Sequence, residues 1–349
     1  MMMSLRTTPI MHALLFSMVI LIASACQAPI AAPQATTAPQ EEASVRLNVV
    51  STVSPITNIV HNIGGDHINL AGIVPEGVNS HTFEPAPSDA RTLAQADIIF
   101  LNGLHLEQPT LQLAEAGKRD DAEIVELGNL TITEDEYIYD FSFPESAGSP
   151  NPHLWTNPIY ALKYAEIVRD KLSELDPANA AAYAANYDAF AAQIDGLDKA
   201  IQAAIDSIPP QNRKLLTYHD SWAYFSPRYG TTVIGAIQPA DFSEPSAREV
   251  ADLIVQLREV GVPAIFGSEV FPSPILSQIG AEAGVTYVDT LSDDDLPGEP
   301  GDAGHSYVNM MVQNVQTMAA ALGGDPTLPA SVDTSNTAGS DGAVEQTQD

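Results

Sequence analysis

Cysteine and basic residues are scarce in this chain of 349 residues. The first scarcity excludes certain structural and metal sites, and the second excludes certain binding partners. One cysteine, Cys26, allows neither an internal disulfide nor a cluster of thiolate metal ligands. Lysine and arginine total 14 against 45 aspartates and glutamates, so the formal net charge is −31. Because such a chain repels nucleic acid and anionic lipid headgroups, we expect neither as a partner. A solvated acidic surface explains the charge most simply.

The first residues are typical of an export signal. Arg6 precedes an apolar stretch at 13–22, and small residues lead from there to Cys26. The stretch is too short to span a bilayer as a helix. A single cysteine directly after such a signal is the position used for lipid attachment. We therefore expect a signal peptide at 1–25 and an extracytoplasmic protein anchored to the membrane through Cys26, in the periplasm or at the cell surface. Plain secretion with a spare thiol is the alternative.

Composition divides the rest of the chain. Residues 26–45 are rich in Pro, Ala and Thr and predict a disordered tether, and residues 326–349 predict a disordered tail. The segment between them is larger than one hydrophobic core usually supports, so we expect two domains. We place an N-terminal lobe at 46–175, a linking helix at 176–208 and a C-terminal lobe at 209–325.

Each lobe shows short runs rich in Val and Ile that alternate with helix-like segments. Such continuous apolar runs are typical of parallel strands covered by helices on both faces. The expected strands are 47–53, 68–74, 98–102 and 124–127 in the first lobe, and 214–218, 232–237, 264–268 and 286–291 in the second. The fold class is therefore α/β, with two lobes that each contain a four-stranded, mostly parallel sheet flanked by helices.

One amphipathic helix joins the two lobes. Its apolar residues recur in steps of three and four, which predicts a single buried seam. They are Tyr183, Tyr187, Phe190, Ile194, Leu197, Ile201 and Ile205. A helix of about 30 residues is roughly 45 Å long, enough to run along both lobes as a spine.

Three histidines and one aspartate stand where predicted strands give way to loops. His81, His153, His219 and Asp289 follow one another at intervals of 72, 66 and 70 residues by subtraction. These intervals are far too long for a local zinc finger but suit ligands from separate loops of an α/β protein, where sites form at the carboxyl ends of strands. Three neutral imidazoles and one carboxylate are ligands that a borderline divalent metal prefers. Glu269 is a rival carboxylate, and His305 could approach the same cleft.

Several motifs resemble the zinc- and manganese-binding lipoproteins of bacterial ABC importers, the cluster A-I family of metal substrate-binding proteins. The resemblance covers nearly all of residues 46–323 and rests on segments 50–56, 62–66, 74–85, 102–104, 151–155, 219–225, 228–230 and 288–291. It implies a metal clamped between two lobes and handed to a membrane permease. In the family pattern His81 and His153 come from the first lobe, and His219 and Asp289 from the second.

The resemblance also suggests which ion is carried. Manganese-type members tend to place a carboxylate at the third ligand position, where this chain has His219. Three nitrogens and one oxygen suit four-coordinate zinc, so we expect zinc, with manganese as the alternative. Many zinc members carry a His-rich acidic loop, whereas residues 118–150 are acidic without a histidine. We expect a monomer that is not an enzyme.

Two other functions use some of the same features. Three histidines on zinc also describe a zinc-dependent hydrolase, although the chain has no His-Glu-x-x-His helix. A surface adhesin would use the same lipid anchor.

Overall fold

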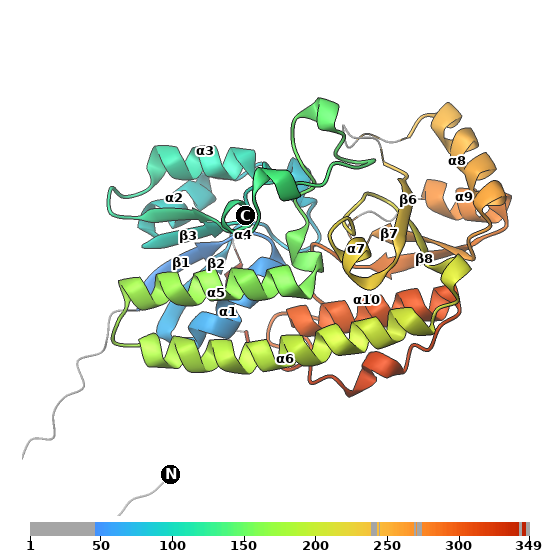
Figure 1. Cartoon of the computed structure of the whole chain (residues 1–349). Coiled ribbons are helices and arrows are strands. Elements are labelled where there is room, and N and C mark those ends of the chain that lie inside the picture. Colours follow the sequence, from blue (N-terminus) through green and yellow to red (C-terminus); the bar gives the residue numbers. More distant parts are fainter. Residues whose placement is uncertain are drawn as a thin grey trace, which may run out of the picture. The chain divides into compact units, whose positions relative to one another are not determined.

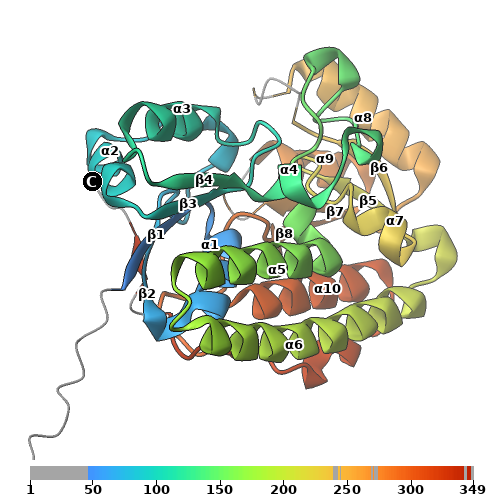
Figure 2. The same cartoon turned by 60° about the vertical axis from the view of Figure 1, so that its left-hand side comes forward.

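The computed structural model describes residues 46–238, 243, 245–268, 270, 274–341 and 344–346. The predicted signal peptide, Cys26 and the tether lie outside these residues, as does Glu269. Two parallel sheets form the framework, and Figures 1 and 2 show them side by side with helices packed around each. This arrangement confirms the predicted α/β fold.

The first sheet has the strand order β4-β3-β1-β2-β9, and all of its pairs are parallel. Its strands are β1 (Leu47–Ser51), β2 (Ile68–Gly72), β3 (Ile98–Leu101), β4 (Glu123–Glu126) and β9 (Glu345–Gln346). Alternate side chains face opposite ways along each strand. Val49 and Phe100 therefore join the core beside α1 (Ser54–Gly64), whereas Val50 and Leu101 pack with residues of α2 (Pro87–Gln95) and α3 (Gln108–Gly117).

The second sheet has the order β6-β5-β7-β8 and is also parallel. Its strands are β5 (Lys214–Thr217), β6 (Thr232–Ala236), β7 (Ala264–Ser268) and β8 (Thr286–Leu291). One face packs on α8 (Ala247–Val260) and α9 (Pro274–Ala283), and the other faces α10 (Tyr307–Leu322). Shorter helices are α4 (Leu127–Thr131) and α7 (Phe225–Tyr229).

Helix α6 (Ala180–Ser207) is the predicted spine. It lies against α1 and α5 (Pro158–Leu175) of the first lobe and against α7 and α10 of the second (Figure 1). Its 28 residues give a length of about 42 Å. The buried residues of its seam belong to one hydrophobic cluster that also contains Phe100 and Phe266, one from each sheet. Because this core is continuous, relative movement of the lobes has to shear packed side chains.

The C-terminal segment differs from the expectation of a disordered tail. Residues 328–331 form a short 3-10 helix against α6, and residues 345 and 346 add strand β9 to the edge of β2. Between them, side chains such as Asn336 and Thr337 bond to α1. The polar composition that suggested disorder supplies these bonds instead.

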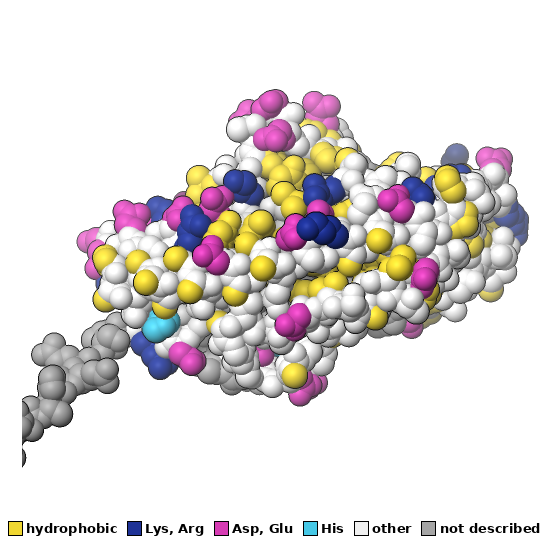
Figure 3. Space-filling model, turned by 60° about the horizontal axis from the view of Figure 1, so that its bottom comes forward, with side chains coloured by type: hydrophobic (Ala, Val, Ile, Leu, Met, Phe, Trp, Pro, Cys, Tyr) yellow, Lys and Arg dark blue, Asp and Glu magenta, His cyan; other side chains and the backbone are white. Residues whose placement is uncertain are grey.

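Acidic groups are dispersed over the surface. On the face shown in Figure 3, Asp and Glu side chains form small groups, one of them at the top of the view, and are otherwise scattered rather than collected in one patch. This distribution agrees with a solvated acidic surface. Within the described part of the chain, no helix combines the length and the apolar character needed to cross a membrane.

Candidate metal centre

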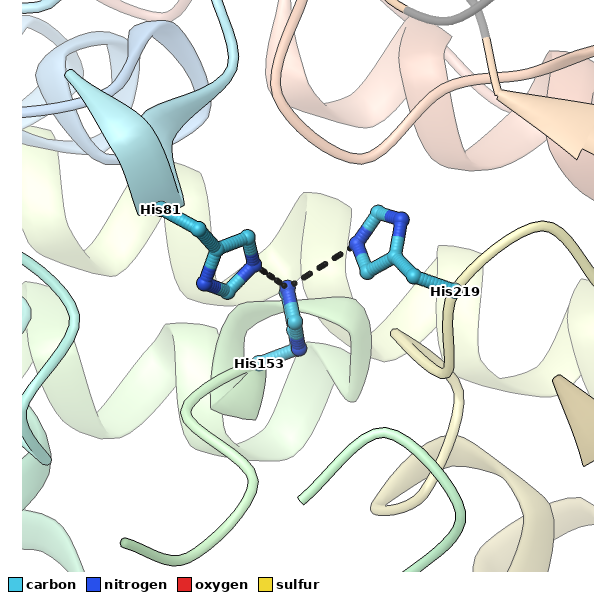
Figure 4. Close-up of side chains that lie close together, drawn as sticks. All are labelled: His81, His153 and His219. Carbon is cyan, nitrogen blue, oxygen red and sulfur yellow. Dashed lines mark hydrogen bonds between the residues drawn. The ribbon is translucent and has the colours of Figure 1, made fainter. Parts of the chain in front are cut away.

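Three loops bring the imidazoles of His81, His153 and His219 together (Figure 4). His81 lies in the short 3-10 helix η2 (Ser80–Thr82) after β2, His153 immediately precedes η5 (Leu154–Thr156), and His219 follows β5. The Nε2 atom of His153 lies 3.0 Å from that of His81 and 3.3 Å from that of His219. The three predicted histidines therefore converge on one point, two from the first lobe and one from the second.

These separations match the geometry of a bound divalent ion. Imidazole nitrogens bind zinc at about 2.0–2.1 Å, so two nitrogens of a tetrahedral site lie roughly 3.3 Å apart. Within the described residues, His81, His153 and His219 form a group whose ligand atoms all lie within 4.8 Å of one another. The donor set fits a divalent transition metal.

Burial favours the metal-binding form of these imidazoles. Desolvation lowers the pKa of His81 well below its usual value, and the nearby His219 lowers it further. Desolvation likewise lowers the pKa of His153, with additional effects from the other two imidazoles. Both rings are therefore neutral at neutral pH and keep a lone pair for a metal, so proton competition is weak there.

Asn151 sets the tautomer of His153. Its Oδ1 accepts a hydrogen bond from the backbone N–H of His153 and lies 2.9 Å from Nδ1 of the ring. Because an amide oxygen only accepts, Nδ1 carries the proton and Nε2 presents its lone pair to the other histidines. The amide nitrogen of Asn151 donates to Oδ2 of Asp140 and to the carbonyl of Asp220 across the lobes. The amide of Asn151 is thereby held from both sides.

The carboxylate beside the histidines belongs to Asp293, and not to Asp289 as predicted. Asp289 is exposed on β8. Asp293 is 2% exposed, and its Oδ2 lies 2.8 Å from Nε2 of His219 and 3.8 Å from Nε2 of His153. The structure thus brings to the histidines a carboxylate four residues beyond the predicted one, which makes Asp293 the candidate for the fourth ligand.

Contacts with the first lobe explain this difference. After β8 the chain bends, and the carbonyl of Asp293 accepts a hydrogen bond from Nε1 of Trp155. Asp294 accepts hydrogen bonds from the backbone N–H and the hydroxyl of Ser80, next to His81. Burial, together with the nearby charge of Asp293, raises the pKa of Asp294 to about 7. Three successive aspartates after a strand were the sequence signal that could have pointed here.

His305 and Glu269 are the other candidate ligands, and the structure places only His305. His305 is buried, and its Nε2 lies 3.5 Å from Oε1 of Glu76 and 3.6 Å from Oδ2 of Asp341. It is not part of the group formed by the three histidines. Glu269 lies outside the described residues, so the structure does not place it.

Comparison with known proteins identifies the family. The model of the family described as zinc-uptake complex component A, periplasmic, matches residues 49–321. The chain belongs to this family. The matched segment contains both sheets up to β8, the spine helix and all three histidines.

Individual relatives agree with this assignment. The periplasmic zinc-binding protein TroA of Treponema pallidum has a TM-score of 0.72 at 27% identity, over 80% of this chain and 99% of that chain. The manganese-binding lipoprotein MntA of Halalkalibacterium halodurans is 27% identical over 88% of this chain and 98% of its own length. The metal ABC transporter substrate-binding lipoprotein ScbA of Streptococcus cristatus is 29% identical over 81% of this chain and 91% of its own.

The role of Asn151 can be tested by substitution. Asn151→Ala removes the acceptor that fixes the protonated nitrogen of His153, so metal affinity should fall roughly 10–100-fold, as is usual when such orienting partners are lost. Titration calorimetry with zinc measures this change. Asn212→Ala is the control, because it removes an asparagine bond to the carbonyl of Leu322 outside the site and should keep wild-type affinity. Wild-type affinity in Asn151→Ala would contradict the role.

Proposed function

We propose that this protein is an extracytoplasmic, high-affinity binding protein for a divalent metal, zinc, which it delivers to the permease of an ABC importer. The convergence of the three histidine Nε2 atoms carries this proposal. Family membership supports it, because similar proteins are named as zinc-binding, manganese-binding or metal ABC transporter substrate-binding proteins. Each lobe contributes to the site, so closure of the lobes encloses the ion and their separation releases it.

The proposed ligands are His81, His153, His219 and Asp293. With the carboxylate of Asp293 beside His219, this proposed shell would have three nitrogens and at least one oxygen. A carrier closes the coordination sphere with protein ligands, whereas a zinc hydrolase keeps one position open for water. A buried fourth ligand therefore favours the carrier over the hydrolase. Spectroscopy of the cobalt-substituted protein for an exchangeable water, combined with a hydrolase assay, separates these two functions.

A pair of substitutions tests which aspartate is the ligand. Asp293→Asn should weaken zinc binding by more than about 100-fold, beyond what outer-shell changes cost, and His153→Ala should do the same. Asp289→Asn, at an exposed position on the preceding strand, should leave zinc affinity unchanged. Calorimetry on all three variants is the measurement. If Asp289→Asn weakened zinc binding and Asp293→Asn did not, Asp289 would be the ligand.

Zinc should be preferred over manganese. Manganese favours oxygen-rich, higher-coordinate sites and lies lowest in the affinity series for nitrogen ligands, and this site offers three imidazoles. When the metal-free protein is equilibrated with equal free concentrations of the two ions, elemental analysis should find mostly zinc. His219→Glu should shift the bound fraction toward manganese. If the wild-type protein bound mostly manganese, the predicted preference for zinc would be wrong.

The proposed location outside the cytoplasm and at the membrane rests on the signal-like residues 1–25 and on Cys26. A lipid on Cys26 would anchor the chain, and the Pro-rich residues 27–45 would let the lobes reach the permease. Cell fractionation tests this directly: Cys26→Ser should appear in the soluble extracytoplasmic fraction, whereas the wild type stays with the membrane. If both remain membrane-bound to the same extent, the anchor is elsewhere.

A further inference from the structure

The C-terminal segment 332–341 lies beyond the family match, which ends at residue 321, and it touches both lobes. After α10 the chain passes along the spine helix. The hydroxyl of Ser207 donates to the carbonyl of Ala204 in its own helix and accepts a hydrogen bond from the backbone N–H of Asp325. Further along the helix, the side-chain amide of Gln193 donates to the carbonyl of Ser335. These contacts carry the segment from the second lobe toward α1 of the first.

Asn336 connects the lobes with one side chain. Its Oδ1 accepts hydrogen bonds from the amides of Asn58 and Asn62 on α1, each at 3.0 Å. Its own amide donates at 3.0 Å to the carbonyl of His305, in the loop that leads into α10 of the second lobe. Both lone pairs of the Asn336 side-chain oxygen therefore bond to the first lobe, and one of its side-chain N–H groups bonds to the second.

Neighbouring residues extend the same bridge. Toward α1, Thr337 donates to Oδ1 of Asn62 through both its backbone N–H and its hydroxyl. Toward the second lobe, Asp341 accepts from the backbone N–H of Gly301 at 2.9 Å and lies 3.6 Å from Nε2 of His305. Asp341 is 4% exposed, so these contacts are shielded from water.

We propose that residues 332–341 act as a strap across the junction of the two lobes, and that the strap limits opening of the cleft and slows release of the metal. The second part rests on the proposed function. A bound ion leaves when the lobes separate, and separation has to break the Asn336 and Asp341 contacts as well as the core along α6. The strap therefore stabilises the closed arrangement relative to the open one.

The experiment separates the strap from the metal site. Full-length protein with Cys26→Ser, Glu115→Cys and Glu259→Cys places fluorophores on exposed positions of α3 and α8, one in each lobe. In metal-free protein, Asn336→Ala should shift the single-molecule energy-transfer distribution toward longer distances between the lobes. Ser335→Ala is the matched control, because its hydroxyl donates to Asp333 within the segment. It should leave the distribution unchanged.

The second readout is the rate of zinc loss to an excess of chelator. Loss of the Asn336 bonds should accelerate release roughly tenfold, the factor expected from one to two net hydrogen bonds. Thr337→Val keeps the side-chain volume but loses the hydroxyl bond to Asn62, so it should accelerate zinc release to a smaller extent. This variant tests the strap if Asn336→Ala does not fold. Unchanged distances and release rates in the folded variants would overturn the strap. Failure of the wild type to bind zinc would overturn the proposed function, while the metal-free distances would still test the strap.

Discussion

The close approach of three imidazole nitrogens, two of them on buried side chains, is the constraint on which the centre of the molecule depends. Nε2 atoms at 3.0 and 3.3 Å from one another have facing lone pairs, and a shared proton can satisfy only one pair of them. A divalent cation satisfies all three at once. Holding the rings in this arrangement requires the fixed tautomer of His153, the backbone positions of η2 and of the turn after β5, and the docking of the two lobes.

The docking of the lobes is built from polar contacts around an apolar spine. Asp295 accepts the backbone N–H of Gly77 with both of its oxygens, Asp294 accepts from Ser80, and Tyr307 donates its backbone N–H to Asn58. The continuous core along α6 limits how far these contacts can separate. The separation between His219 and the other two histidines depends on this docking, because His219 comes from one lobe and the other two from the other.

Much of this architecture could be predicted because it rests on local pattern. The strand runs lay within two residues of the observed bounds, since continuous β-branched segments between turn residues are a strong signal. The three histidines were found because each stands at a strand or loop end within a specific motif. The seam of α6 followed from its period of three and four residues.

The errors arose where tertiary contacts decide the conformation. Asp289 looked like a strand-end ligand, but the bend after Leu291 is fixed by Trp155 and Ser80 from the other lobe, and these contacts bring Asp293 to the site instead. The C-terminal segment looked disordered because it is polar, yet polar side chains such as Asn336 bond well to a polar partner surface. Neither partner is adjacent in sequence, so local pattern could not reveal them.

X-ray absorption spectroscopy of the zinc-loaded protein tests the central claim most directly. A site formed by three imidazoles and one carboxylate predicts four ligands at about 2.0–2.2 Å, with the outer-shell scattering of three imidazole rings. His153→Ala should remove one ring from that signal. A six-coordinate shell of oxygen ligands, or a spectrum unchanged by the loss of His153, would contradict the account.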